Sequence, residues 1–447
     1  MKKLIYFFVV LILALSAVTV VYSQQYCIPG RFDTSYVFAP AMIDTQNVVY
    51  GNNIDYLGNP VNLSFLIAYP NTAIDPLPKR PFVLLIHGGG YVDGDKYQLQ
   101  PVMMDLAMRG YVCASIDYRI GWLTGGNPFA CNGSGYSLVQ AIYRAVQDSK
   151  AAFRYFAFNA DLYKIDTAYM FSGGISAGAV TSLLVSYASE QHFTMYYPNI
   201  VNELGGLNTA TNGYTSSFKV KGILSSSGGI LDTSFIVYSN FTRSSNAVPT
   251  LMFHGTADPN VPYGTGYAYS CPNYVGTQGA QEITKRLRTI VVPLELNYVP
   301  GGGHENFYPI PYIQLRTSMF LKRYLCNDFR QIINENYTNI IDTNIGWIVT
   351  GGIAHNKLQT ADYKLHQNYP NPFNPVTKIS YELPANQFVS LRVYNMLGRE
   401  VSMLVNENKQ AGKYTVDFNA SDLTSGVYFY VLRAGDFKAT GKMVLAK

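Results

Sequence analysis

Short apolar runs alternate along the chain with longer segments in which apolar residues recur every three or four positions. Buried strands are predicted at the runs 61–69, 81–87, 111–118, 168–171, 219–226, 249–255 and 293–299. Helices are predicted at 103–110, 137–160, 281–288 and 312–325, and in the stretch that follows Ser176. Strands that alternate with helices predict an α/β fold with a mainly parallel sheet flanked by helices.

The pattern changes after Cys326. Residues 331–363 lack the alternating series, and we expect them to be a linker. From residue 364, short runs with period-two alternation are separated by turns such as LG, AG and SG, and they predict about seven antiparallel strands. The predicted domains are therefore an α/β domain over 24–330 and a small all-β sandwich over 364–447.

Residues 1–23 have the layout of a secretory signal peptide. Two lysines precede a long apolar run, and Val21 and Ser23 are small residues of the kind found before a cleavage site. The run approaches the length of a membrane span, so a retained anchor is the alternative. The small residues and the lack of a second such run favour export.

Five widely spaced cysteines include no CxxC pair, so no zinc or iron-sulfur site is expected. Export permits disulfides, although the spacing does not reveal the pairing, and five reduced thiols are the alternative. Cys113 lies in an apolar strand run, and we expect it to be the unpaired cysteine.

Composition removes one class of function. The chain is 48% hydrophobic and 14% charged, which is typical of a globular protein with a large core. Its net charge of +5 comes from the two ends, because residues 24–363 carry 21 Lys and Arg against 22 Asp and Glu. This near-neutral body lacks the basic footprint of nucleic-acid-binding proteins, so no nucleic acid partner is expected.

Chemically active residues follow four predicted strands at the point where each strand ends. They are the run His87-Gly88-Gly89-Gly90, Ser176 within the sequence GISAG, Asp258 and His304. The carboxyl ends of parallel strands meet at one edge of a sheet, which is where α/β proteins place their sites. A serine displayed on a glycine-rich turn, a histidine base and an orienting aspartate are the three groups of nucleophilic ester or amide hydrolysis.

The HGGG and GISAG motifs, with the order Ser, Asp, His, resemble the α/β-hydrolase fold over residues 55–326. Within that fold they resemble the HGGG esterases related to hormone-sensitive lipase and to feruloyl and acetylxylan esterases. The resemblance implies a Ser176, Asp258, His304 triad, an acyl-enzyme, and no cofactor or metal. It also implies an oxyanion hole made by the backbone N–H of Ala177 and of Gly89 or Gly90. Asp232, which follows an earlier strand, is the alternative acid, and His87 is expected to brace its loop.

Substrate selection is expected to fall to two long insertions, 119–137 and about 191–218. Tyr91 and Trp122 are candidate substrate-binding residues, and Phe129 is another; ordinary loop packing is the alternative for each. The expected substrates are acetyl, feruloyl or other short-acyl esters, including polymeric ones. A serine peptidase, a lipase or polyesterase of the same fold, and an inactive surface-binding protein are the alternatives.

The C-terminal region resembles the type A sorting domain of type IX secretion substrates. The resemblance is carried by YPNPFNP, LGREV, SGVYFY and the terminal KMVLAK. It implies that residues 364–447 contact the outer-membrane secretion machinery and that the protein is secreted or displayed on the cell surface. From the strand pattern alone, a carbohydrate-binding or adhesive sandwich is the alternative.

Overall fold

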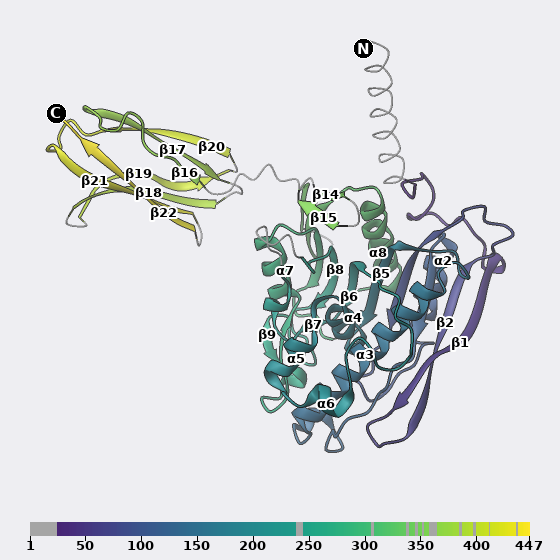
Figure 1. Cartoon of the computed structure of the whole chain (residues 1–447). Coiled ribbons are helices and arrows are strands. Elements are labelled where there is room, and N and C mark those ends of the chain that lie inside the picture. The colour runs from purple at the N-terminus through teal and green to yellow at the C-terminus, as the bar shows by residue number, and fades with distance from the viewer. Residues whose placement is uncertain are drawn as a thin grey trace, which may run out of the picture. The chain divides into compact units, whose positions relative to one another are not determined.

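A computed structural model describes residues 25–237, 245–304, 308–336, 339–344, 347–350, 353–356, 364–383, 387–396, 399–410, 412–434 and 437–447. The chain divides into two compact units, Met1–Asn356 and Lys357–Lys447, which we describe separately (Figure 1). The predicted signal peptide lies outside the described residues and stays a prediction. Within the described part, no helix is both long and apolar enough to cross a membrane.

The first unit is built on a ten-stranded sheet with the strand order β1-β2-β4-β3-β5-β6-β8-β11-β12-β13. Parallel pairing joins β4 Val112–Ile116, β3 Arg80–Ile86, β5 Ile165–Ile175, β6 Val220–Ser226, β8 Thr250–Gly255, β11 Leu294–Val299 and β12 Arg330–Glu335. Antiparallel pairing adds β1 Ile43–Ile54, β2 Pro60–Pro70 and β13 Asn339–Asn344 at the edges. The mainly parallel sheet that the sequence predicts is confirmed.

Helices flank this sheet (Figure 1). The long α3 Gly135–Phe158 contacts α4 Ala177–Tyr187, and α2 Gln100–Met108 contacts α8 Ile310–Leu325. The other α-helices among the described residues are α5 Glu190–Tyr196, α6 Ile200–Leu204 and α7 Ala280–Thr289. The five helices predicted from apolar periodicity all form, with bounds within three residues of those expected where bounds were predicted.

Aromatic side chains join α3 to the sheet. The ring of Phe156 lies 4.6 Å from that of Phe65 in β2 and 4.5 Å from that of Phe82 in β3, measured between centroids. A buried ion pair also joins α3 to the segment after β4: the Arg119 Nη2 lies 2.9 Å from the Asp148 Oδ1. These contacts hold α3 against the sheet next to β5, the strand that leads to Ser176.

The sheet extends beyond the point where the sequence predicted a linker to begin. Within the range 331–363, β12 pairs parallel with β11 and β13 pairs antiparallel with β12. The burial of β12 alternates along the strand, and few of its residues are strongly apolar, so its sequence does not have the continuous run of a central strand. Two smaller sheets complete the unit, formed by β7 Gly229–Ile230, β9 Thr265–Tyr267 and β10 Gly276–Gly279, and by β14 Trp347–Thr350 and β15 Ile353–Asn356.

The described residues of the second unit form an antiparallel all-β sandwich of seven strands, as the sequence predicts. One sheet contains β16 Lys364–Leu365, β17 Val376–Leu383 and β20 Gly412–Asn419. The other contains β18 Gln387–Asn395, β19 Glu400–Lys409, β21 Gly426–Ala434 and β22 Phe437–Leu445. Alternate side chains of β21 point inward: Tyr428, Tyr430, Leu432 and Ala434 are all buried.

Two disulfides lie in the first unit, Cys27–Cys326 and Cys131–Cys271. The first ties the start of the described chain to the end of α8. Cys113 is free and buried in β4, which confirms the prediction that it is unpaired.

Candidate active site

Ser176 occupies the turn between β5 and α4. Its backbone has φ 53° and ψ −122°, the strained conformation that displays a nucleophile at the end of a strand. Close backbone packing explains the flanking glycines. A Cβ on Gly174 would lie 2.4 Å from the carbonyl carbon of Gly178, and one on Gly178 would lie 2.0 Å from the carbonyl oxygen of Ile86.

His304 reaches Ser176 from the loop that follows β11. Its Nε2 lies 2.7 Å from the Ser176 Oγ, and its Nδ1 lies 2.8 and 2.9 Å from the two carboxylate oxygens of Asp258. Asp258 follows β8, so the three residues come from the ends of three strands of one sheet. The structure therefore brings the predicted nucleophile, base and acid into one hydrogen-bonded chain.

Asp258 accepts more hydrogen bonds than His304 supplies. The backbone amides of Asn260 and Val261 donate to its Oδ1 at 2.9 and 3.0 Å, and the His254 Nε2 lies 3.1 Å from its Oδ2. Burial alone would raise the pKa of Asp258, but hydrogen bonds from His254 and His304 outweigh it and hold this pKa well below its usual range. The group is therefore a carboxylate at neutral pH, as the orientation of a histidine base requires.

Asp232, the alternative acid, has other partners. It caps a short 3-10 helix, where its Oδ1 accepts a hydrogen bond from the Ser234 amide at 2.7 Å. Its Oδ2 accepts one from the Tyr196 hydroxyl at 3.3 Å. The geometry thus favours Asp258 as the partner of His304.

The glycines that follow His87 lie against the serine. A Cβ on Gly88 would lie 3.3 Å from the Cβ of Ser176, while Gly89 and Gly90 line the same cavity as Ser176 and Ala177. Among the described residues, none accepts a hydrogen bond from the backbone N–H of Gly89, Gly90 or Ala177. Unused amides beside a displayed serine have the form of an oxyanion hole.

His87 itself braces the glycine turn, as expected. It is buried, its Nδ1 lies 2.7 Å from the Gly88 carbonyl oxygen, and its ring stacks on Tyr118 at a centroid distance of 4.2 Å. Burial lowers the pKa of His87, so the imidazole is neutral in this environment. It is not among the described residues that line the cavity.

Two aromatic side chains hold the carbonyl group of Gly90. The Trp122 Nε1 donates to it at 3.1 Å and the Tyr269 hydroxyl donates to it at 3.3 Å. Trp122 is buried and is not among the described residues that line the cavity. It contacts the glycine loop, and not the cavity where a substrate contact was predicted. Tyr91 does line the cavity, and its hydroxyl donates to the Ala177 carbonyl oxygen at 2.9 Å.

The cavity over Ser176 and His304 has a volume of about 330 Å³. Its wall combines Pro128 and Phe129 from the first predicted insertion with residues between Asn260 and Thr277. No described residue of the second insertion, 191–218, lines it. The wall is thus supplied partly by a segment after β8 that the sequence did not indicate.

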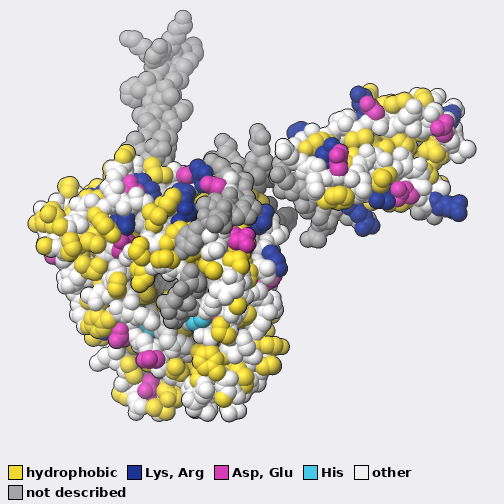
Figure 2. Space-filling model, turned by 180° about the vertical axis from the view of Figure 1, so that it is seen from behind, with side chains coloured by type: hydrophobic (Ala, Val, Ile, Leu, Met, Phe, Trp, Pro, Cys, Tyr) yellow, Lys and Arg dark blue, Asp and Glu magenta, His cyan; other side chains and the backbone are white. Residues whose placement is uncertain are grey.

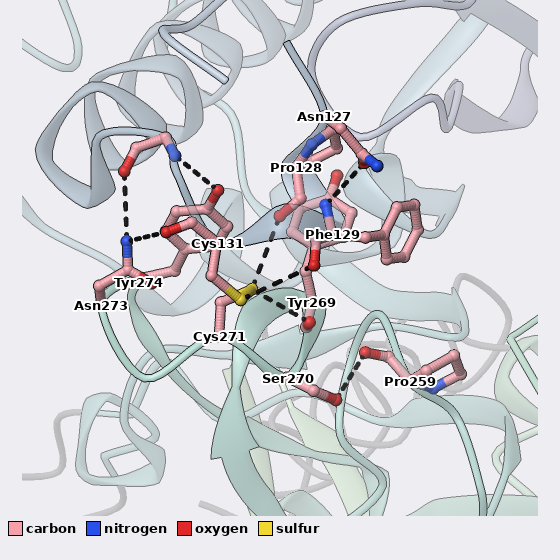
Figure 3. Close-up of a disulfide and its surroundings, with 11 residues drawn as sticks. Asn127, Pro128, Phe129, Cys131, Pro259, Tyr269, Ser270, Cys271, Asn273 and Tyr274 are labelled. Atoms are coloured by element: carbon pink, nitrogen blue, oxygen red, sulfur yellow. Dashed lines mark hydrogen bonds between the residues drawn. A yellow bond between two sulfur atoms is a disulfide. The ribbon is translucent and has the colours of Figure 1, made fainter. Parts of the chain in front are cut away.

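A disulfide joins the two loops that form this wall (Figure 3). Cys131 follows Phe129 by two residues and Cys271 follows Tyr269 by two, and the rings of Phe129 and Tyr269 meet edge to face at 5.2 Å. Asn273 strengthens the junction, because its side-chain amide donates to the Cys131 carbonyl oxygen at 2.9 Å. The bond therefore holds a cavity wall that in turn contacts Gly90 through Tyr269.

Charges on the surface are mixed. Figure 2 shows Lys and Arg side chains interspersed with Asp and Glu side chains on one face of the molecule. In the described part of the chain, no three His, Cys, Asp or Glu side chains are grouped so as to hold a metal ion.

Two segments of the chain match models of known protein families. Residues 67–240 match the family BD-FAE, and residues 367–446 match the secretion system C-terminal sorting domain. The first unit contains a BD-FAE esterase-like α/β-hydrolase domain. The BD-FAE match includes the glycine turn and Ser176 but ends before Asp258 and His304, so the geometry above is what connects those two residues to the motif.

Individual proteins show more distant similarity to this chain. The chain is similar to Thermogutta terrifontis esterase 2 phosphorylated by paraoxon, with 18% identity, TM-score 0.43, and 63% of this chain and 94% of that one covered. The butyrate-bound form of that esterase has 18% identity, TM-score 0.40, and coverages of 62% and 91%. Among curated proteins, the non-reducing polyketide synthase ausA of Aspergillus calidoustus is 38% identical over 82 residues, which are 18% of this chain and 3% of that enzyme.

Proposed function

We propose that this chain is an exported serine carboxylic-ester hydrolase. One observation carries the proposal: the hydrogen-bonded chain from Ser176 through His304 to Asp258 lies at a cavity that also presents three unused backbone amides. An esterase-like α/β-hydrolase domain joined to a sorting domain supports the same conclusion. Together they combine a nucleophile, a base, an anion-stabilising site and a route out of the cell.

The proposed reaction begins when His304 Nε2 accepts the proton of the Ser176 hydroxyl, and the Ser176 Oγ attacks the ester carbonyl carbon. The carbonyl oxygen becomes an oxyanion, which accepts hydrogen bonds from the amides of Ala177 and of Gly89 or Gly90. His304 then donates its proton to the departing alcohol, leaving an acyl-enzyme on Ser176. Water, activated by the same histidine, releases the acid and restores the serine.

Asp258 orients the imidazole of His304. Its carboxylate accepts the Nδ1–H of His304, which leaves Nε2 free to accept a proton from the serine. It also stabilises the imidazolium that forms during both halves of the reaction.

The proposed substrates are acetyl, feruloyl or other short-acyl esters, including esters of polymers. A cavity of about 330 Å³ is at the small end of ligand sites, which favours a small group over a long acyl chain. Export through the predicted signal peptide and the sorting domain supports a substrate outside the cell. A peptidase, a lipase or polyesterase, and an inactive binding protein are the alternatives that the experiment must separate.

The test is hydrolysis of p-nitrophenyl esters from acetate to decanoate by residues 24–447, with Ser176→Ala as the control. Rapid turnover of the short esters that disappears in the variant is expected. Turnover that persists in the variant would reject Ser176 as the nucleophile, and no turnover of any ester would favour the binding protein. Preference for decanoate would favour a lipase, and cleavage of a peptide substrate in preference to all esters would favour a peptidase.

A further inference from the structure

A second cavity, of about 570 Å³, lies at the end of the sheet opposite the catalytic cavity. Its described lining comes from the C-terminal half of α3, the end of α4, the segment 208–220 and residues just before β8. It shares no described lining residue with the cavity over Ser176. Its volume falls within the range of small-molecule sites.

Two basic side chains from successive turns of α3 line this second cavity. Lys150 and Arg154 are 8% and 5% exposed, and among the described residues neither forms an ion pair with a carboxylate. No described group forms a hydrogen bond with the Lys150 Nζ. Arg154 donates from Nη2 to the Ala210 carbonyl oxygen at 2.7 Å and to the Asn212 Oδ1 at 3.3 Å, but its buried Nε and Nη1 have no hydrogen-bond partner among the described residues.

The charge balance of the second cavity is therefore positive. The exposed Lys219 also lines it, and no Asp or Glu is among its described lining residues. Glu190 acts on Lys150 only from beyond ion-pair distance, and its Oε1 accepts a hydrogen bond from the Leu207 amide. Burial and the neighbouring Arg154 lower the pKa of Lys150 to about 8, so the ammonium group is still mostly charged at pH 7. A buried cation without a partner is costly, and an anion in the cavity would offset that cost.

The other described lining residues indicate which kind of anion would fit the cavity. They are rich in hydroxyl and amide side chains, which can donate to and accept from the hydroxyls of a ligand: Asn208, Thr209, Thr215, Ser216 and Ser217. Tyr214 and Phe218 add aromatic surface. A carboxylate near the two cations, joined to a ring that carries several hydroxyls, would use both parts of this lining.

We propose that the cavity lined by Lys150 and Arg154 is a binding site for an acidic sugar, with the ligand carboxylate held by the two α3 cations. The site is separate from Ser176, and the proposal does not depend on the reaction proposed above. On an exported protein, such a site would hold an acidic glycan while the opposite end of the sheet carries the serine.

The experiment titrates the full chain with D-galacturonic acid and D-glucuronic acid by calorimetry, alongside neutral D-galactose and sodium sulfate. Saturable binding of a sugar acid is expected, with weaker binding of the neutral sugar and of sulfate. Lys150→Met should weaken it about tenfold or more, because a charge-assisted hydrogen bond is lost, whereas Lys285→Met, on the exposed face of α7, should not. Ser176→Ala should bind as the wild type does.

Several outcomes would overturn the proposal. Absence of saturable binding to either sugar acid would do so, as would equal affinity for sulfate, because the hydroxyl-rich lining would then have no role. Binding that is lost in Ser176→Ala would place the ligand in the catalytic cavity instead. Methionine removes the charge of Lys150 while keeping most of its length, so the variant should fold, and circular dichroism checks this before the titration. Failure of these titrations would leave the ester assay unaffected.

Discussion

The substitution Asp258→Asn removes the negative charge of the acid while keeping the shape of its side chain. An asparagine keeps one oxygen, which can still accept hydrogen bonds from the amides of Asn260 and Val261 at the Oδ1 position, but its NH₂ group then takes the Oδ2 position, the nearer of the two to His304 Nδ1 at 2.8 Å. The His304 Nδ1 would have to accept, so its proton would move to Nε2, 2.7 Å from the Ser176 Oγ. A protonated Nε2 cannot take the serine proton. The comparable loss in Ser-His-Asp hydrolases is about ten-thousandfold in kcat, or roughly 5.5 kcal/mol of transition-state stabilisation.

The assay is kcat for p-nitrophenyl acetate, with Asp232→Asn as the matched control because that carboxylate caps a helix and contacts Tyr196. We expect the control to stay within about threefold of the wild type. Near-normal turnover in Asp258→Asn would refute the argument that this carboxylate sets the tautomer of His304. A large loss in Asp232→Asn instead would transfer the role of the acid to that residue.

The same substitution predicts a change in acid stability. The folded-state pKa of Asp258 lies below its unfolded value, so its stabilising contribution is present above about pH 4 and is lost as the pH falls. Asparagine does not titrate. The difference in free energy of unfolding between wild type and Asp258→Asn should therefore narrow between pH 4 and pH 2 in urea titrations. A difference that stays constant over this range would contradict the depressed pKa.

Three further predictions concern the turn around Ser176, the Cys131–Cys271 disulfide and the C-terminal domain. Gly178→Ala should destabilise the protein by about 2–3 kcal/mol in urea unfolding, because its Cβ would lie 2.0 Å from the Ile86 carbonyl oxygen; a change under about 0.5 kcal/mol would refute that clash. Replacing Cys131 and Cys271 together by serine should lower kcat/KM about tenfold or more, because the cavity wall and its contact with Gly90 loosen; unchanged kinetics would show that the wall holds its shape without the bond. Deleting residues 364–447 should leave active enzyme inside the cell envelope, measured by fractionation, and continued release into the medium would contradict the role of the sorting domain.

The sequence predicts the site as far as its local geometry is encoded in short motifs. Gly174 and Gly178 are recognisable because only glycine tolerates the backbone contacts around Ser176. His304 could be placed because it follows a buried strand of an α/β series. The Nε2 of the buried His254 lies beside both the Val261 carbonyl oxygen and the Asp258 carboxylate, and no local sequence pattern indicates which acceptor a buried imidazole will face.

Tyr269 has a role that its place in the sequence does not indicate. It lies in an irregular segment after β8, yet it lines the cavity and contacts Gly90, which is 179 positions away along the chain. Trp122 lies in the loop that the sequence predicts, but its indole N–H donates to the glycine turn, and Trp122 is not among the described residues that line the cavity over Ser176. Both roles depend on how two loops pack, and a disulfide whose pairing the spacing could not reveal holds those loops together.

By itself, then, the sequence determined the order of the main strands and longer helices from β2 to α8, the change to a β-sandwich and the residues displayed at strand ends, although it did not indicate the edge strand β1. Each of these is a local property, because apolar periodicity and special backbone turns involve residues that are neighbours in the chain. Only the tertiary structure decided that β12 and β13 extend the sheet, which cysteines pair, which aromatic rings hold Gly90 and that Lys150 and Arg154 line a cavity without acidic partners. These features arise from contacts between distant segments, and packing, hydrogen bonding and charge balance among such segments have no fixed spacing in the sequence.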